Sequence, residues 1–203
     1  LFCGLIPGPL LVAAFFVTIL ILLREKQKLD MRGLSWIIVG RIIGTAIAAV
    51  ILSSISTRTL GITFGSLVIL AVLMSASGLH FSPTRPMRVG AGLLSGIMGT
   101  LGSIGGPPVA LIYQDSSPQK LRATLSGYFI FGSLISLSAL IPAGKYGLEE
   151  VKLSLLMLPG ILAGFLVSGK LIPLLKGGRL RVAVWIISVF AGGTLLIQQL
   201  FAK

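Results

Sequence analysis

The sequence predicts an all-α, polytopic membrane protein: one integral membrane domain with about seven transmembrane segments. The chain has 203 residues, of which 55% are hydrophobic, and its mean hydropathy is +1.02. Only 11% of the residues are charged, whereas a soluble domain carries about 25%. The apolar runs are each about 20 residues long, which is the length that a hydrocarbon core of about 30 Å requires.

Seven apolar segments can be separated along the chain. Two of them contain a single charged residue, Arg41 in the second and Lys170 in the sixth, and the others contain none. In chain order, the segments are 1–23, 33–57, 59–79, 89–113, 123–144, 153–175 and 182–202. We expect each of them to cross the membrane as a helix.

The charged residues lie mostly in short loops between these segments. The net charge is +12, but the bases are scattered rather than gathered on one soluble face, which argues against a nucleic-acid partner. Loop bases instead suit a bilayer with anionic headgroups. On alternate sides of seven full crossings the bases number nine and six, which weakly favours a cytoplasmic position for the loop that carries Arg24 and Arg32. If the segment 89–113 is re-entrant, the later assignments invert.

The residue types needed for catalysis or metal binding are scarce. Cys3 is the only cysteine and His80 the only histidine, which excludes an intrachain disulfide and a cysteine- or histidine-based metal cluster. All five acidic residues lie in loops, so we expect no metal, no cofactor and no enzymatic activity.

An internal repeat is suggested by shifting the sequence against itself. A shift of 120 residues places Gly40 over Gly160 and Gly44 over Gly164. We therefore predict two repeats, 1–79 and 80–203, an arrangement common in secondary transporters, whose substrate site lies between the repeats. The segment 89–113 then lacks a counterpart, and the repeat predicts one before residue 1.

The segment 89–113 contains the sequence IGGPP, residues 104–108, which is poorly suited to a helix interior. Glycine costs about 1 kcal/mol there and proline about 3 kcal/mol. We predict a half-helix over 89–102, unwound backbone over 103–106, and a second half-helix that starts at Pro107. Free N–H groups of its first turn, with the Ser103 hydroxyl, would bind an anion. The alternative is a proline kink used only for packing, a role that we also expect for Gly90, Gly92 and Gly96.

Other polar residues lie within apolar segments. Arg41 either faces a cavity, where it would bind an anionic substrate, or extends to the membrane surface. Thr124 and Tyr128 share one helix face, so they either line a cavity facing the break or form interhelical hydrogen bonds. The candidate substrate-binding residues are therefore Arg41, Ser103, Gly105, Gly106, Pro107, Pro108, Thr124 and Tyr128.

Three features together resemble the second half of the TauE/SafE family, the sulfite exporter-like membrane transporters. They are IGGPPVALIY, the following loop with Pro118, and LRATLSGYFIF. The resemblance implies a bacterial inner-membrane permease, built of duplicated four-helix halves, for sulfite, sulfonates or related sulfur-containing anions. Val39, which stands where the second half has Pro159, departs from it. A non-transporting scaffold or a channel is the alternative function, and homo-oligomerisation stays open.

Overall fold

The computed structural model describes residues 8–25, 29–78, 81–144 and 146–171, with a few isolated positions between 186 and 194. All regular structure in this part of the chain is helical, which confirms the all-α prediction. The helices are α1 (Gly8–Glu25), α2 (Met31–Ser54), α3 (Thr57–Ala76), α4 (Arg85–Gly102), α5 (Gly106–Tyr113), α6 (Pro118–Leu140) and α7 (Leu148–Leu171). Cys3, His80 and most of the predicted segment 182–202 lie outside the described residues.

Four of the described helices are long and apolar enough to cross a membrane, namely α2, α3, α6 and α7, and α1 has a shorter apolar stretch, Gly8–Leu23. Side-chain caps set where three of them begin, since Asp30, Ser56 and Ser117 each accept a hydrogen bond from a first-turn N–H of α2, α3 and α6. Such caps satisfy N–H groups that have no partner within the helix. A multi-pass membrane protein is therefore what both sequence and structure indicate.

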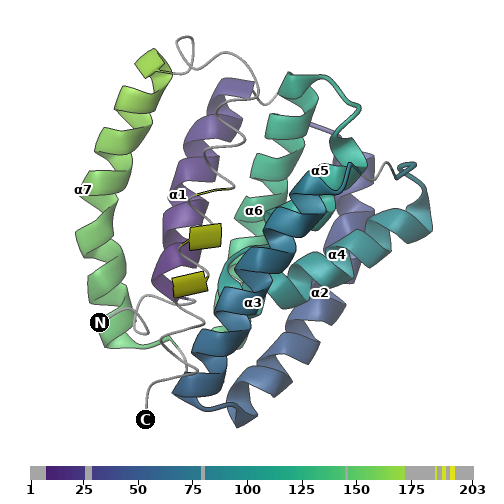
Figure 1. The fold of residues 1–203 in the computed structure, drawn as a ribbon. Coiled ribbons are helices and arrows are strands. Elements are labelled where there is room, and N and C mark those ends of the chain that lie inside the picture. The colour runs from purple at the N-terminus through teal and green to yellow at the C-terminus, as the bar shows by residue number, and fades with distance from the viewer. Residues whose placement is uncertain are drawn as a thin grey trace.

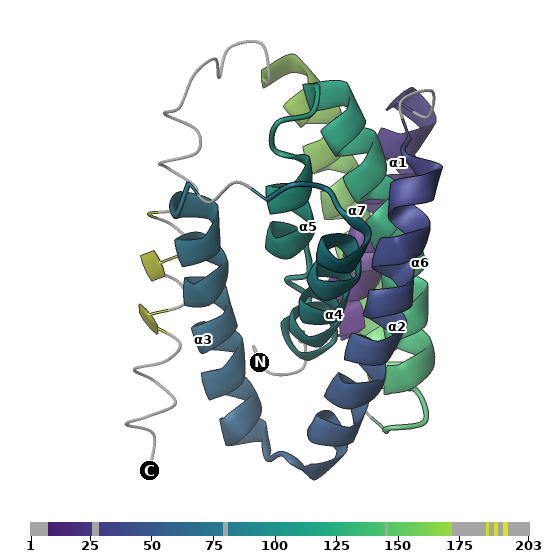
Figure 2. The ribbon, with the colours of Figure 1, turned by 90° about the vertical axis from the view of Figure 1, so that its right-hand side faces the viewer.

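The helices form one bundle, in which α1 lies between α7 and α6 and α2 packs along α4 (Figure 1). Turned by 90°, the same bundle shows α3 at one edge and α5 beside α6 (Figure 2). Helix α1 begins beside the loop that follows α6, because Gly8 contacts Tyr146. The two helices therefore run in opposite directions. The division into repeats at 1–79 and 80–203 stays a prediction.

Glycines bring α2 and α4 into close contact. A Cβ atom on Gly40 would lie 2.0 Å from the carbonyl oxygen of Val89, and one on Gly92 would lie 2.0 Å from that of Ile37. Both distances are far below van der Waals contact, so only glycine allows the two backbones to approach this closely. Gly90, which we expected to pack in the same way, has nothing within 4 Å of its Cβ position, so that prediction was wrong.

The broken segment α4–α5 does not cross the membrane. Arg88, in the first turn of α4, and Tyr113, the last residue of α5, both contact Asp30, the residue before α2. The segment therefore enters and leaves the bundle on the same side, and the prediction that 89–113 spans the bilayer was wrong. The physical reason is that the chain reverses where helix continuation is blocked, so two short helices replace one long one.

Candidate functional site

The break between α4 and α5 lies where the sequence predicted it. Helix α4 ends at Gly102, and Ser103 caps it with φ 57° while its N–H donates to the carbonyl of Gly99. Helix α5 begins at Gly106, one residue earlier than predicted. Pro107 and Pro108 therefore occupy its second and third positions, which need no intrahelical N–H. The same prolines remove two of the N–H donors that we expected to bind an anion, so this helix end is a weak anion site by itself.

Arg41 supplies the positive charge that the helix end lacks. It lies ten residues into α2, about 15 Å along the helix and so near the middle of a 30 Å core, and it is 2% exposed. Of the two alternatives for Arg41, extension to the membrane surface is therefore ruled out. Its guanidinium lies against three glycines: a Cβ atom on Gly99, Gly105 or Gly132 would lie 2.3, 2.6 or 3.2 Å from it.

The hydrogen bonds of Arg41 all go to neutral oxygens. Nη1 donates to the carbonyl of Ser95 at 2.8 Å and to the hydroxyl of Tyr128. Nη2 donates to the carbonyl of Gly132 at 3.1 Å and to the hydroxyl of Ser136 at 2.7 Å. Nε has no hydrogen-bond partner among the described residues, and the ion pairs found there do not include Arg41. As far as the described residues show, a full positive charge is thus buried without a carboxylate, an arrangement that is costly unless an anion binds there.

Hydroxyl groups surround this charge and hold the break in place. The hydroxyl of Ser95 donates to the carbonyl of Gly105 and so fastens the non-helical backbone to α4. One turn further along α4, the hydroxyl of Thr100 hydrogen-bonds to Ser136 at 2.9 Å and to Thr45 at 3.2 Å. The guanidinium and these hydroxyls come from α2, α4 and α6, so tertiary packing of three helices builds the site.

The predicted site residues divide between this cluster and other places. Arg41, Tyr128 and Gly105 come together at the break. Thr124 does not, because its hydroxyl accepts a hydrogen bond from the N–H of Asp30 at 3.3 Å, toward the start of α2. Ser103 caps α4, Pro108 is buried in α5, and Gly106 and Pro107 line a separate cavity.

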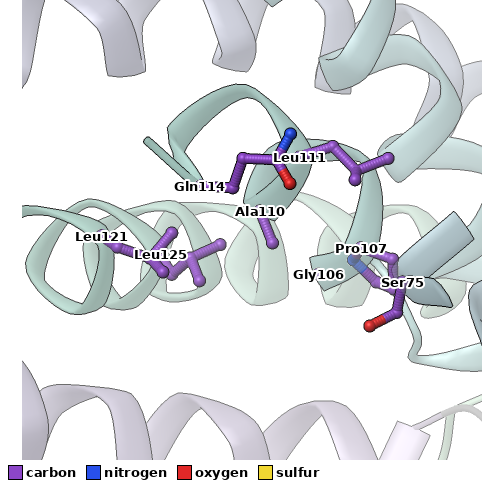
Figure 3. A pocket seen from close by; sticks show the side chains of 8 residues that line it. All are labelled: Ser75, Gly106, Pro107, Ala110, Leu111, Gln114, Leu121 and Leu125. Carbon is purple, nitrogen blue, oxygen red and sulfur yellow. The ribbon is translucent and has the colours of Figure 1, made fainter. Parts of the chain in front are cut away.

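That cavity has a volume of about 440 Å³ and lies between α3, α5 and α6 (Figure 3). Gly106 lines it, while the neighbouring Gly105 contacts Arg41, so the break separates the cavity from the buried charge. Most of its wall is apolar. The residues that line the cavity are Ser75, Gly106, Pro107, Ala110, Leu111, Gln114, Leu121 and Leu125.

A second charged cluster is centred on Asp30. Its carboxylate accepts hydrogen bonds from the N–H of Gly33 at 2.9 Å and from the hydroxyl of Tyr113 at 3.1 Å. It also pairs with Arg88 at 3.6 Å and with Lys120 at 3.7 Å. Partial burial raises the pKa of Asp30, but these hydrogen bonds and the two cations outweigh burial and leave that pKa below its ordinary value.

Sequence reasoning missed several members of both clusters. Gly132 and Ser136 were not among the predicted site residues, although they follow the predicted Tyr128 at intervals of four residues and so share its face of α6. This spacing was visible, but nothing in the sequence said that the face meets Arg41. For Asp30, the sequence indicated only a position in a loop between two apolar segments. In the described part of the chain, no group of three or more His, Cys, Asp or Glu residues could hold a metal ion.

Comparison with known proteins agrees with this architecture. The family model described as "Sulfite exporter TauE/SafE" matches residues 4–195, nearly the whole chain. Searches for similar curated proteins and for similar solved structures give no match. The chain therefore belongs to the sulfite exporter TauE/SafE family of membrane transporters.

Proposed function

We propose that this protein is a secondary transporter for small anions, with sulfite or a related sulfur-containing anion as substrate, and that Arg41 binds the anion. Membership of the sulfite exporter TauE/SafE family is the reason to propose sulfite as the first substrate to test. The observation that carries the residue assignment is the Arg41 guanidinium, which is 2% exposed, lies beside the break and, within the described residues, is compensated only by neutral oxygens.

The surroundings of Arg41 suit an oxyanion that binds and leaves. Its backbone acceptors, the carbonyls of Ser95 and Gly132, are fixed in their helices, whereas the hydroxyls of Tyr128 and Ser136 can rotate. An arriving anion can take the place of these hydroxyls on the guanidinium, and the hydroxyls can then donate to the anion. A planar guanidinium also matches the geometry of oxyanions better than an ammonium group does.

The alternatives fit this site less well. A scaffold needs neither a helix broken inside the membrane nor a buried cation without a counter-charge, because each of these destabilises the fold. A channel would conduct without saturation at low millimolar substrate, whereas a binding site at Arg41 predicts saturable flux. Non-helical backbone within the membrane is also a common feature of transporter binding sites.

The re-entrant course of α4–α5 favours one orientation in a bacterial inner membrane. All loops that connect to the start of α2, α4 and α6 then lie on one side. By sequence, this side carries Arg24, Lys26, Lys28, Arg32, Arg85, Arg88, Lys120 and Arg122, whereas the opposite side carries Arg58, Lys145 and Lys152. Basic residues favour the cytoplasmic side, where anionic headgroups would attract them. We therefore place Asp30 at the cytoplasmic end of the bundle.

The test is sulfite flux into liposomes that contain the purified protein. We expect wild type to show saturable flux and Arg41→Gln to lose it, because the anion would have no counter-charge at the centre of the membrane. Arg41→Lys keeps the positive charge, but an ammonium group has only three donors for the four oxygens that Arg41 contacts. We therefore expect weak flux from this variant. Lys152→Gln, which removes an exposed charge at the start of α7, is the matched control and should transport like wild type.

Two results would contradict the proposal. Wild-type liposomes that take up no sulfite or related anion would reject the substrate class. Undiminished flux in Arg41→Gln, with the control also active, would reject the assignment of Arg41. Thermal unfolding of each variant in detergent shows whether a loss of flux reflects loss of the fold.

A further inference from the structure

The Asp30 carboxylate lies where donors from four helices converge. The N–H of Gly33 comes from α2, Arg88 from α4, the hydroxyl of Tyr113 from α5 and Lys120 from α6. Backbone N–H, hydroxyl, guanidinium and ammonium groups are the donors that proteins use to bind small oxyanions. The arrangement is therefore that of an anion site which a carboxylate of the same chain occupies.

The positive charge around Asp30 exceeds what one carboxylate neutralises. Arg88 and Lys120 supply two positive charges, and the N-terminal ends of α2, α4 and α6 add their partial positive charges on the same side. The two ion pairs are also long, 3.6 and 3.7 Å, whereas strong charge-assisted hydrogen bonds measure about 2.7–2.9 Å. Asp30 is thus held loosely enough to be exchanged for another anion.

Helix α5 connects this cluster to the buried charge. It ends at Tyr113, which donates to Asp30, and it begins at Gly106, beside the residue that contacts Arg41. Eight residues of helix span about 12 Å. An anion at the Asp30 cluster would therefore lie on the same side of the bundle as the ends of the re-entrant segment, about one short helix away from Arg41.

We propose that Arg88, Lys120 and Tyr113 form an outer anion-binding site for the transported oxyanion, and that the Asp30 carboxylate occupies this site between transport events. The anion displaces Asp30, which frees Tyr113 and thereby the end of α5. This inference rests on the proposed transport function, but the outer site is distinct from Arg41. The competing explanation is that Asp30 only fastens four helices together.

Asp30→Asn separates the two explanations. Asparagine caps helices as well as aspartate does, so α2 keeps its start while the competing negative charge is lost. If Asp30 competes with the substrate, the KM for sulfite falls by roughly three- to tenfold, the range expected for removing two partly exposed ion pairs. If Asp30 is only structural, KM stays unchanged or rises. Asp115→Asn makes the same change at an exposed position of the α5–α6 loop and is the matched control.

Two further variants test whether the effect runs through the cations. Arg88→Gln should raise the KM for sulfite, and Asp30→Asn should lower KM by a smaller factor once Arg88 is also replaced, because the carboxylate then competes only for Lys120 and Tyr113. A decrease in KM that is undiminished without Arg88, or that Asp115→Asn reproduces, would overturn the proposal.

A binding measurement keeps this inference separate from the transport function. In an Arg41→Gln background, sulfite should raise the thermal unfolding midpoint more when Asp30 is also replaced by Asn, because the outer site is then vacant. No added stabilisation by sulfite would overturn the outer site, even if wild type transports. Conversely, absence of wild-type flux together with this stabilisation would reject the transport proposal and retain the outer anion site.

Discussion

The replacement Gly99→Ala adds one methyl group against the guanidinium of Arg41. The added Cβ would lie 2.3 Å from Nη1, 2.8 Å from Nη2 and 2.9 Å from Cζ. Because all three distances fall short of the usual contact of about 3.5 Å, a rotation of one terminal group cannot relieve the overlap. The planar guanidinium has to retreat as a whole, by about 1 Å.

That displacement is large compared with the hydrogen bonds that hold Arg41. The bonds to the carbonyls of Ser95 and Gly132, which an arriving anion leaves in place, measure 2.8 and 3.1 Å, and a shift of about 1 Å takes at least one of them beyond hydrogen-bond reach. A hydrogen bond to a charged group contributes about 1.5–3 kcal/mol, so losing one corresponds to at least a tenfold change in anion affinity. We expect the KM for sulfite to rise by that factor or more.

The assay is concentration-dependent sulfite flux in liposomes, with thermal unfolding as a check on the fold. Gly90→Ala is the matched control, because it places the same methyl group on the same helix where nothing lies within 4 Å. The control should keep wild-type KM and unfold at the same or a higher temperature, since alanine favours helix over glycine. If Gly99→Ala transports sulfite with the KM of Gly90→Ala, then the position of Arg41 does not govern anion binding.

Two further predictions concern the Asp30 side of the bundle. Because the pKa of Asp30 is lower in the folded protein than in an unfolded chain, its contribution to stability is complete above about pH 4 and is lost as the pH falls through the folded pKa. Thermal unfolding should therefore lose more stability between pH 5 and 3 in wild type than in Asp30→Asn, and equal losses would contradict the prediction. For orientation, a cysteine at Ser77, beyond the end of α3, should be cytoplasmic, and one at Ala143, after α6, should face the other side. In a Cys3→Ser background, a membrane-impermeant thiol reagent added to intact cells should label only the second, and the reverse pattern would reject the orientation.

Local properties of the sequence are enough to predict the long apolar helices and the position of the break. Apolar runs of bilayer length leave helix as the conformation that satisfies every backbone group in lipid, which is why α2, α3, α6 and α7 could be predicted from composition. Pro107 and Pro108 block a continuous helix through local sterics and a missing donor, and Gly105 and Gly106 weaken it further. These effects act within a few residues of the chain, so they need no knowledge of the partner helices.

The surroundings of the break and of the charged residues, by contrast, depend on how the helices pack together. The sequence does not distinguish a buried Arg41 from one that extends to the membrane surface. The difference depends on whether α4 and α6 cover the face of α2 that carries Arg41. The re-entrant course of α4–α5 likewise depends on a distant contact, since Arg88 and Tyr113 meet at Asp30. Because the segment does not cross the membrane, the loops before α4 and after α5 lie on the same side, whereas a full crossing would place them on opposite sides. The burial of Arg41, its neighbours and the side of the membrane on which each loop lies all follow from the packing of the bundle. This packing combines the break after α4 with side chains of α2 and α6, so that three helices form the candidate anion site.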